Sequence, residues 1–146
     1  MGRTLMILLI EDNPDDAELT RYAFSKAGIA VPVVTLGDGG TAVAYFEGAG
    51  AYADRAAHPY PALVLLDLKL PRRSGFEVLR AVRDNPEAKH VPVVVLTSSS
   101  READIRRAYE AGANSYLVKP GGRDALLDLV RSLDGFWLRF NRTVAT

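Results

Sequence analysis

Five polar side chains follow apolar runs of this sequence, and their groups suit phosphoryl transfer. Glu11 and Asp12 follow the first run, Asp67 the third, Thr97 the fourth and Lys119 the fifth. Carboxylates packed together repel one another, and a hard dication such as Mg²⁺ relieves that repulsion. A carboxylate beside such an ion can attack phosphorus, while an ammonium and a hydroxyl stabilise the charge on the transferring group. These residue types therefore predict Mg²⁺-dependent formation of an aspartyl phosphate.

Each side chain has its own expected role in this chemistry. Asp12 and Asp67 are predicted to bind Mg²⁺ directly, and Asp67 is also the predicted phosphoacceptor. Glu11 has a longer side chain, so we expect it to act on the metal through a water molecule. The Lys119 ammonium and the Thr97 hydroxyl are predicted to contact the phosphoryl oxygens.

Purely structural roles are the alternative for each residue. Acids at a helix start are favoured by the helix dipole, but Asp15 and Asp16 already supply that charge beside Glu11-Asp12. Asp67 could be a turn residue, and Thr97 could be a helix N-cap. The position of these residues after separate apolar runs favours the chemical interpretation, and the N-cap alternative stays open for Thr97.

The pattern of apolar runs predicts the elements that position these side chains. Strands are predicted over 5–10, 31–36, 62–66, 91–96 and 115–118, and helices over 14–27, 39–46, 74–83, 101–111 and 124–140. Residues 48–61, rich in Gly, Ala and Pro, predict an extended loop. Buried strands that alternate with helices predict an α/β fold with a parallel sheet covered on both faces. Ligands of such sheets bind beyond the carboxyl ends of the strands, where the polar residues lie.

Composition limits the other classes of function. The chain has 146 residues, with 18 basic and 18 acidic side chains, which fits one domain and gives no sign of nucleic-acid binding. The absence of cysteine excludes disulfides, thiolate metal sites and a cysteine nucleophile. The first apolar run is too short for a membrane span and is followed by no signal-peptide cleavage pattern. We therefore expect a cytoplasmic protein that does not bind membranes.

Together these motifs resemble the receiver domain of bacterial response regulators in two-component signalling. The matching residues are Glu11-Asp12, the run Leu-Leu-Asp67-Leu-Lys-Leu-Pro71, Gly75, Thr97-Ser98 and Lys119-Pro120. The resemblance covers residues 4–133 and leaves 134–146 as a helical extension and tail. It implies a flavodoxin-like doubly wound sheet of strand order 2-1-3-4-5 in a single domain without an attached output domain. It also implies that a sensor histidine kinase donates the phosphoryl group, and that the protein signals and is not an enzyme for other substrates.

The resemblance implies further details of the site. The backbone carbonyl of Lys69 would complete the metal shell, and the peptide bond between Lys119 and Pro120 would be cis. A switch would follow phosphorylation, in which Thr97 moves toward the phosphate and the ring of Tyr116 rotates inward. Packing of a half-buried strand aromatic is the alternative for Tyr116.

Three residues near the predicted site depart from the common receiver pattern or vary within it. Glu11 stands where many receivers have Asp, and metal binding is expected to survive because its role is the outer one. Lys69 lies two residues after Asp67, and Ser99 lies two residues after Thr97. We hypothesise that Lys69 and Ser99 set the lifetime of the phosphate by governing the access of water.

Within the family, the chain resembles the small regulators paired with phytochrome-type kinases. The sequence Glu11 to Pro14, the long loop before the third strand and the Phe136-Trp137 pair carry this resemblance, which implies a bacteriophytochrome as the kinase. The last helix has an apolar stripe, part of which must cover the sheet. Leu133, Phe136, Trp137 and Phe140 extend that stripe and predict a two-fold homodimer.

Two other functions fit part of the sequence. A metal-dependent phosphohydrolase with an aspartyl nucleophile is one, but such enzymes resemble Asp-x-Asp, and Lys69 stands at the second Asp. An unphosphorylated receiver that acts only as an adaptor is the other, although it would not need a complete site. Neither Gly-rich phosphate-binding fingerprint is present, which argues against a nucleotide site.

Overall fold

The structure is a computed structural model that describes residues 4–144. The described strands are β1 (Thr4–Ile10), β2 (Val33–Leu36), β3 (Pro61–Leu66), β4 (Val93–Thr97) and β5 (Ser115–Val118). The described α-helices are α1 (Pro14–Lys26), α2 (Gly39–Glu47), α3 (Gly75–Asp84), α4 (Glu102–Glu110) and α5 (Arg123–Leu133). A 3₁₀ turn, η1 (Gly50–Tyr52), follows α2, and a π-helical segment, η2 (Asp134–Phe140), follows α5. Within this range no helix is both long and apolar enough to cross a bilayer.

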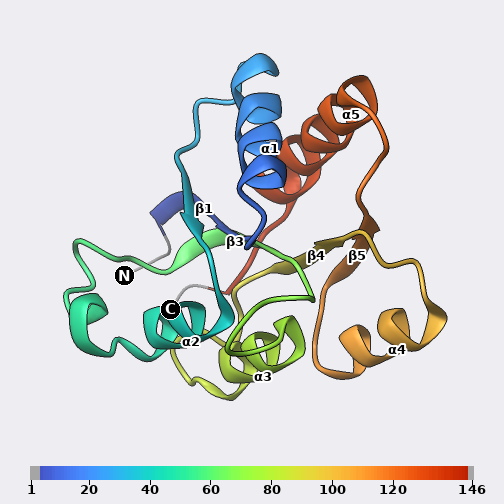
Figure 1. Ribbon diagram of the computed structural model, residues 1–146. Helices are drawn as coiled ribbons and strands as arrows, with labels where there is room; N and C mark the ends of the chain where they lie inside the picture. The colour runs from blue at the N-terminus through green and yellow to red at the C-terminus, as the bar shows by residue number, and fades with distance from the viewer. Residues whose placement is uncertain (1–3, 145–146) are drawn as a thin grey trace.

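All the strand pairs are parallel, and their order is β2-β1-β3-β4-β5, as predicted. Helices α1 and α5 cover one face of this sheet, and α2, α3 and α4 lie on the other (Figure 1). Ile10 pairs with Leu36 on one side and with Leu66 on the other, so β1, β2 and β3 end level with one another. This register brings the residues after β1 and β3 to the same edge of the sheet.

The central strands are apolar on both faces because each face meets a helical layer. Along β1, Met6, Leu8 and Ile10 join the core cluster that includes α2 and α3. The alternate residues Ile7 and Leu9 join the cluster that includes α1 and α5. Burial of such a side chain contributes about 1.5–3 kcal/mol, so a few strand residues fix the sheet strongly. The edge where the strands end is therefore carried by the buried core of the protein.

Local sequence signals place the helices that begin at this edge. The Asn13 side chain accepts hydrogen bonds from the amides of Asp15 (2.9 Å) and Asp16 (3.1 Å), and Pro14 occupies the first turn of α1. Together these features fix the start of α1 directly after β1, at the residue where the helix was predicted to begin. Ser74 caps α3 in the same way, although its helix starts one residue later than expected.

Prolines shorten two of the predicted strands. The sequence predicts strands from residues 31 and 91, but β2 begins at Val33 and β4 at Val93. Pro32 and Pro92 lack an amide hydrogen and cannot donate within a sheet. Their carbonyls still accept hydrogen bonds from neighbouring strands, so both prolines lie at the strand starts.

The segment before β3 is more ordered than an extended loop. It contains η1, and the guanidinium of Arg55 ties it to the end of α2 by donating to the carbonyls of Tyr45 and Phe46. The same guanidinium lies 4.5 Å from the ring centroid of Tyr60. Composition alone does not indicate these contacts, because they join one cation to carbonyls from a separate helix.

The C-terminal helix differs from the prediction in two ways. It changes from α-helical to π-helical after Leu133, close to Gly135, whose missing side chain weakens an α-helix. Leu133 was predicted as a dimer contact, and this is wrong: it is only 3% exposed and packs in the core with Val130. Trp137 is half-buried against the same core cluster, whereas Phe136 and Phe140 are 55% and 79% exposed.

Candidate functional site

The predicted site residues are held by the backbone of the sheet. Three of their amides continue the hydrogen bonding of the strands: Glu11 to the Leu36 carbonyl (3.0 Å), Asp67 to that of Ile10 (3.0 Å) and Lys119 to that of Thr97 (2.7 Å). Thr97 is itself the last residue of β4. The residues predicted to act together therefore lie at one edge of the sheet.

The Lys119 ammonium lies at the centre of this group. It is 2.5 Å from Glu11 Oε1, 2.9 Å from Asp16 Oδ2 and 3.0 Å from Asp67 Oδ2. An ammonium has three donors, and each of them here has a carboxylate within reach. Burial alone would lower the pKa of Lys119, but the hydrogen bonds to Glu11, Asp16 and Asp67 outweigh it and raise that pKa above 10.5. Lys119 is therefore fully cationic at neutral pH.

The Asp67 carboxylate is buried and uses its two oxygens differently. Oδ2 faces Lys119, while Oδ1 accepts hydrogen bonds from Thr97 Oγ1 (2.9 Å) and from the Lys69 amide (3.3 Å). Burial acts to raise the pKa of Asp67, but the hydrogen bonds from Lys119 and Thr97 hold it below its ordinary value. Asp67 is thus kept ionised, as a carboxylate nucleophile must be.

Glu11, Asp12 and Asp67 form the acidic group predicted from the sequence. One carboxylate oxygen from each lies within 4.8 Å of the others, and Asp12 is exposed while the other two are buried. Burial, helped by the nearby charge of Asp67, raises the pKa of Glu11 to about 7 against the opposing hydrogen bond from Lys119. Three converging carboxylate oxygens match the hard donors that Mg²⁺ and Mn²⁺ prefer, so these residues fit such an ion.

Close packing behind the acceptor fixes the position of its backbone. A Cβ atom placed on Gly75 would lie 2.3 Å from the carbonyl oxygen of Asp67, which no real structure tolerates. The Gly75 amide also donates to the Leu68 carbonyl at 2.9 Å. Gly75 therefore permits α3 to start directly against the acceptor strand.

A second set of contacts joins β5 to the loop after β4. The Tyr116 hydroxyl donates to the Ser99 carbonyl (2.9 Å), and the Ser99 hydroxyl donates to Asp104 Oδ2 (2.6 Å). The Tyr116 ring packs against the small core cluster that includes Leu68 and Ala108. These contacts place Tyr116 beside the loop that follows Thr97 but do not test its predicted rotation.

The structure corrects one site prediction and leaves another open. The described residues contain no cis peptide bond, so the prediction of a cis bond between Lys119 and Pro120 is wrong. Trans is the lower-energy isomer of an X-Pro bond, and the Lys119 amide keeps its hydrogen bond to Thr97 with it. The predicted role of the Lys69 carbonyl as a metal ligand stays a prediction.

Sequence reasoning missed Asp16 as a member of the site. It assigned that carboxylate to the helix dipole, whereas the side chain reaches Lys119, which lies 103 positions further along the chain. A usable signal was present, because the first turn of a helix that follows a strand lies above the carboxyl edge of the sheet. Acids in that turn are close to any cation at the edge.

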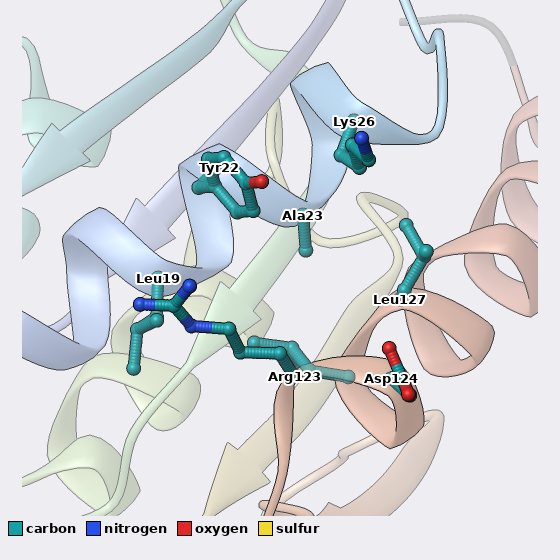
Figure 2. Close-up of a pocket in the computed structure, with 8 residues that line it drawn as sticks. Leu19, Tyr22, Ala23, Lys26, Arg123, Asp124 and Leu127 are labelled. Carbon is teal, nitrogen blue, oxygen red and sulfur yellow. The ribbon is translucent and has the colours of Figure 1, made fainter.

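The structure also has a hollow that lies apart from this chemistry. It lies between α1 and α5 and has a volume of about 110 Å³ (Figure 2). Leu19, Tyr22 and Lys26 line it from α1, and Arg123 and Leu127 from α5. None of the five residues predicted to carry the phosphoryl chemistry lines this hollow. Side-chain chemistry, not cavity size, therefore locates the candidate site.

Comparison with known proteins agrees with this geometry. Residues 7–131 match the family model described as response regulator receiver domain. The chain is 38% identical to response regulator Rcp1 of Synechocystis sp. over 133 residues, which is 91% of this chain and 88% of Rcp1. An Mn²⁺-bound structure of Rcp1 superposes with a TM-score of 0.85 at 37% identity, covering 97% of this chain and all of that one.

Two further solved structures are similar over nearly the whole chain. The phosphorylated cyanobacterial phytochrome response regulator RcpA has a TM-score of 0.86 at 36% identity, covering 99% of this chain and 100% of RcpA. Response regulator RPA3017, from red light signalling of R. palustris, has a TM-score of 0.90 at 34% identity, covering 98% and 100%. The chain therefore belongs to the response regulator receiver domain family and is a homologue of the phytochrome-associated regulators Rcp1 and RcpA.

Proposed function

We propose that this receiver accepts a phosphoryl group from a sensor histidine kinase onto Asp67 in a Mg²⁺-dependent reaction. The observation that carries the proposal is the environment of the Asp67 carboxylate. Lys119 contacts one of its oxygens, Thr97 the other, and Glu11 and Asp12 lie beside it. A turn or capping residue would need none of this arrangement.

The residues of the chain supply most of what the reaction requires. Asp67 attacks phosphorus, so that its Oδ–P bond forms while the bond from phosphorus to the donor breaks. The Lys119 ammonium balances negative charge on the transferring group, and the Thr97 hydroxyl donates to it. Glu11, Asp12 and Asp67 would hold Mg²⁺, which when bound neutralises charge on the carboxylates and on the phosphoryl oxygens.

Membership of the family supports a proposal for the partner and for the readout. RcpA and RPA3017 are named for phytochrome and red light signalling, which supports a phytochrome-type histidine kinase as the donor for this chain. We place the reaction in the cytoplasm, as is usual for receivers. The protein acts as a signalling switch that assists only its own phosphorylation and dephosphorylation. Thr97 and Tyr116 form the switch, supported by the hydrogen bond that ties Tyr116 to the loop after Thr97.

The lifetime of the phosphate depends on Lys69 and Ser99 in this proposal. Lys69 is exposed next to the acceptor strand, and the Ser99 hydroxyl is held by Asp104. Measurement of the dephosphorylation rate of Lys69→Ala tests the role of Lys69. An unchanged rate would exclude it.

A two-fold homodimer through the C-terminal segment is the proposed assembly. Phe136 and Phe140 of η2 are largely exposed, and large exposed aromatics on one short segment are typical of an interface. Trp137 supports them from its half-buried position. Leu133 takes no direct part, because it is in the core.

Incubation with acetyl phosphate and Mg²⁺, followed by intact mass, tests the proposed function. Wild type should gain one phosphoryl group, while Asp67→Asn and wild type in excess chelator should gain none. Absence of label in wild type would favour the adaptor alternative. Continuous turnover of a phosphate ester would instead favour the phosphohydrolase. Addition of a candidate kinase then tests the proposed donor.

A further inference from the structure

Asp16 makes a contact that its expected role in the helix does not require. It lies in the first turn of α1, yet its carboxylate reaches across the edge of the sheet to the Lys119 ammonium, 2.9 Å away. The helix is capped without this carboxylate, because the Asn13 side chain accepts the first amide hydrogen bonds. The Asp16 side chain is therefore free to act on Lys119.

Asp16 differs from the other two carboxylates that contact Lys119. Glu11 and Asp67 belong to the acidic group that fits a metal ion, and Asp67 is also the phosphoacceptor. Asp16 is not among the carboxylates of that group in the described part of the chain. Its hold on the ammonium thus competes neither with a metal ion nor with the transferred group.

Lys119 needs such a partner because its side chain is long and flexible. A lysine ammonium is a mobile point charge on four methylene groups, unlike the rigid fork of arginine. Contacts to Glu11 and Asp67 alone would hold it against the two carboxylates that the reaction itself uses. The contact from Asp16 on α1 holds the ammonium beside Asp67, and Asp16 itself takes no part in the bonds that form or break.

We propose that Asp16 is a positioning residue for phosphoryl transfer, which holds the Lys119 ammonium over the Asp67 carboxylate. This inference rests on the proposed function, since it assigns Asp16 a part in that reaction. The effect should be moderate, because the Asp16 side chain is 40% exposed and such pairs are screened by solvent.

The first test compares two neighbouring acids of the same helix turn. Asp16→Asn keeps the shape of the side chain and removes its charge, and Asp15→Asn is the matched control, because Asp15 is exposed and does not contact Lys119. We expect Asp16→Asn to lower the rate of labelling by acetyl phosphate about three- to fivefold. Asp15→Asn should leave that rate unchanged, and the defect of Asp16→Asn should shrink as salt is raised.

A second test reports on the contact without using the reaction. Urea unfolding of wild type, Asp16→Asn, Lys119→Met and the double variant forms a cycle that measures coupling between the two side chains. Non-additive shifts of the unfolding midpoint are expected, and additive shifts would overturn the inference. Asp16→Glu should recover part of the labelling rate, because it restores the carboxylate.

The possible failures can be distinguished. If wild type is not labelled, the proposed function fails and this inference fails with it. If wild type is labelled and Asp16→Asn reacts as fast as Asp15→Asn, only the positioning role of Asp16 is overturned.

Discussion

At the scale of single residues, the candidate site shifts the pKa values of two neighbouring carboxyl groups, Asp67 and Glu11, in opposite directions. Asp67 keeps its charge through Lys119 and Thr97, while burial favours the protonated form of Glu11. Adjacent carboxyls whose environments move their pKa values apart can take different roles. The structure thus keeps the nucleophile Asp67 ionised at a pH where the neighbouring Glu11 is only partly ionised.

Substitution of Thr97 tests whether its hydrogen bond to Asp67 contributes to phosphoryl transfer. It is only 1% exposed, and its hydroxyl donates to Asp67 Oδ1 at 2.9 Å. Thr97→Val keeps the shape of the side chain but removes the donor, so labelling by acetyl phosphate should slow about ten- to a hundredfold. Thr97→Ser keeps the hydroxyl and should retain most of the rate. Equal rates for the valine and serine variants would exclude a role for the hydroxyl.

At the scale of elements, the start of α3 is set by close backbone contact. Gly75→Ala would place a methyl group 2.3 Å from the Asp67 carbonyl oxygen, so either α3 or the acceptor residue must move. We expect a loss of stability of about 2–4 kcal/mol together with slower labelling. Gly37→Ala is the control, since its added Cβ would meet no atom within 4 Å. Urea unfolding and intact mass measure the two effects, and a Gly75→Ala variant as stable as Gly37→Ala would contradict the prediction.

The cap of α2 predicts how stability depends on pH. Asp38 accepts hydrogen bonds from the Thr41 amide (2.7 Å) and hydroxyl (2.8 Å), and the amide contact is the main cause that lowers the pKa of Asp38 below 3.8. A lowered folded pKa gives stability that is present above the unfolded pKa and is lost as the pH falls through the folded value. Asp38→Ala should therefore cost about 1 kcal/mol at neutral pH.

The stability difference between wild type and Asp38→Ala should also change with pH in a defined direction. Protonation of Asp38 removes its advantage, so the stability difference between wild type and Asp38→Ala should narrow below about pH 4. Asp38→Asn keeps an N-cap that carries no charge and serves as the control. Urea unfolding measures all three proteins, and a difference that stays constant from neutral to acid pH would disagree with this account.

Sequence periodicity predicted the elements better than the contacts between them. Asp67 and Lys119 could be placed together because parallel strands end at one edge, and each residue follows a strand. The Asp16 contact was missed, because periodicity places the first turn of α1 near that edge but does not show which acid of the turn points to Lys119. The exposed face of the last helix was predicted incorrectly at Leu133, because an apolar stripe does not by itself show where the part that covers the sheet ends.

At the scale of the whole molecule, the exposed aromatics of η2 predict assembly. Phe140 is 79% exposed, so Phe140→Ala removes apolar surface with little effect on the core. We expect light scattering to show a shift from dimer to monomer in this variant. Tyr109→Ala, which removes a 49% exposed aromatic from α4, should leave the dimer intact. A wild type that is monomeric at high concentration would exclude the dimer.

The amides of Glu11, Asp67 and Lys119 are bonded as strand amides, at 2.7–3.0 Å, although each residue is chemically part of the site. In heavy water, such protons are released only when the surrounding structure opens cooperatively. The reacting side chains should therefore sit on positions that exchange as slowly as the interior of the protein. Deuterium uptake at these three amides would then report the opening of the whole domain, with exchange rates equal to those of amides in the centre of the sheet.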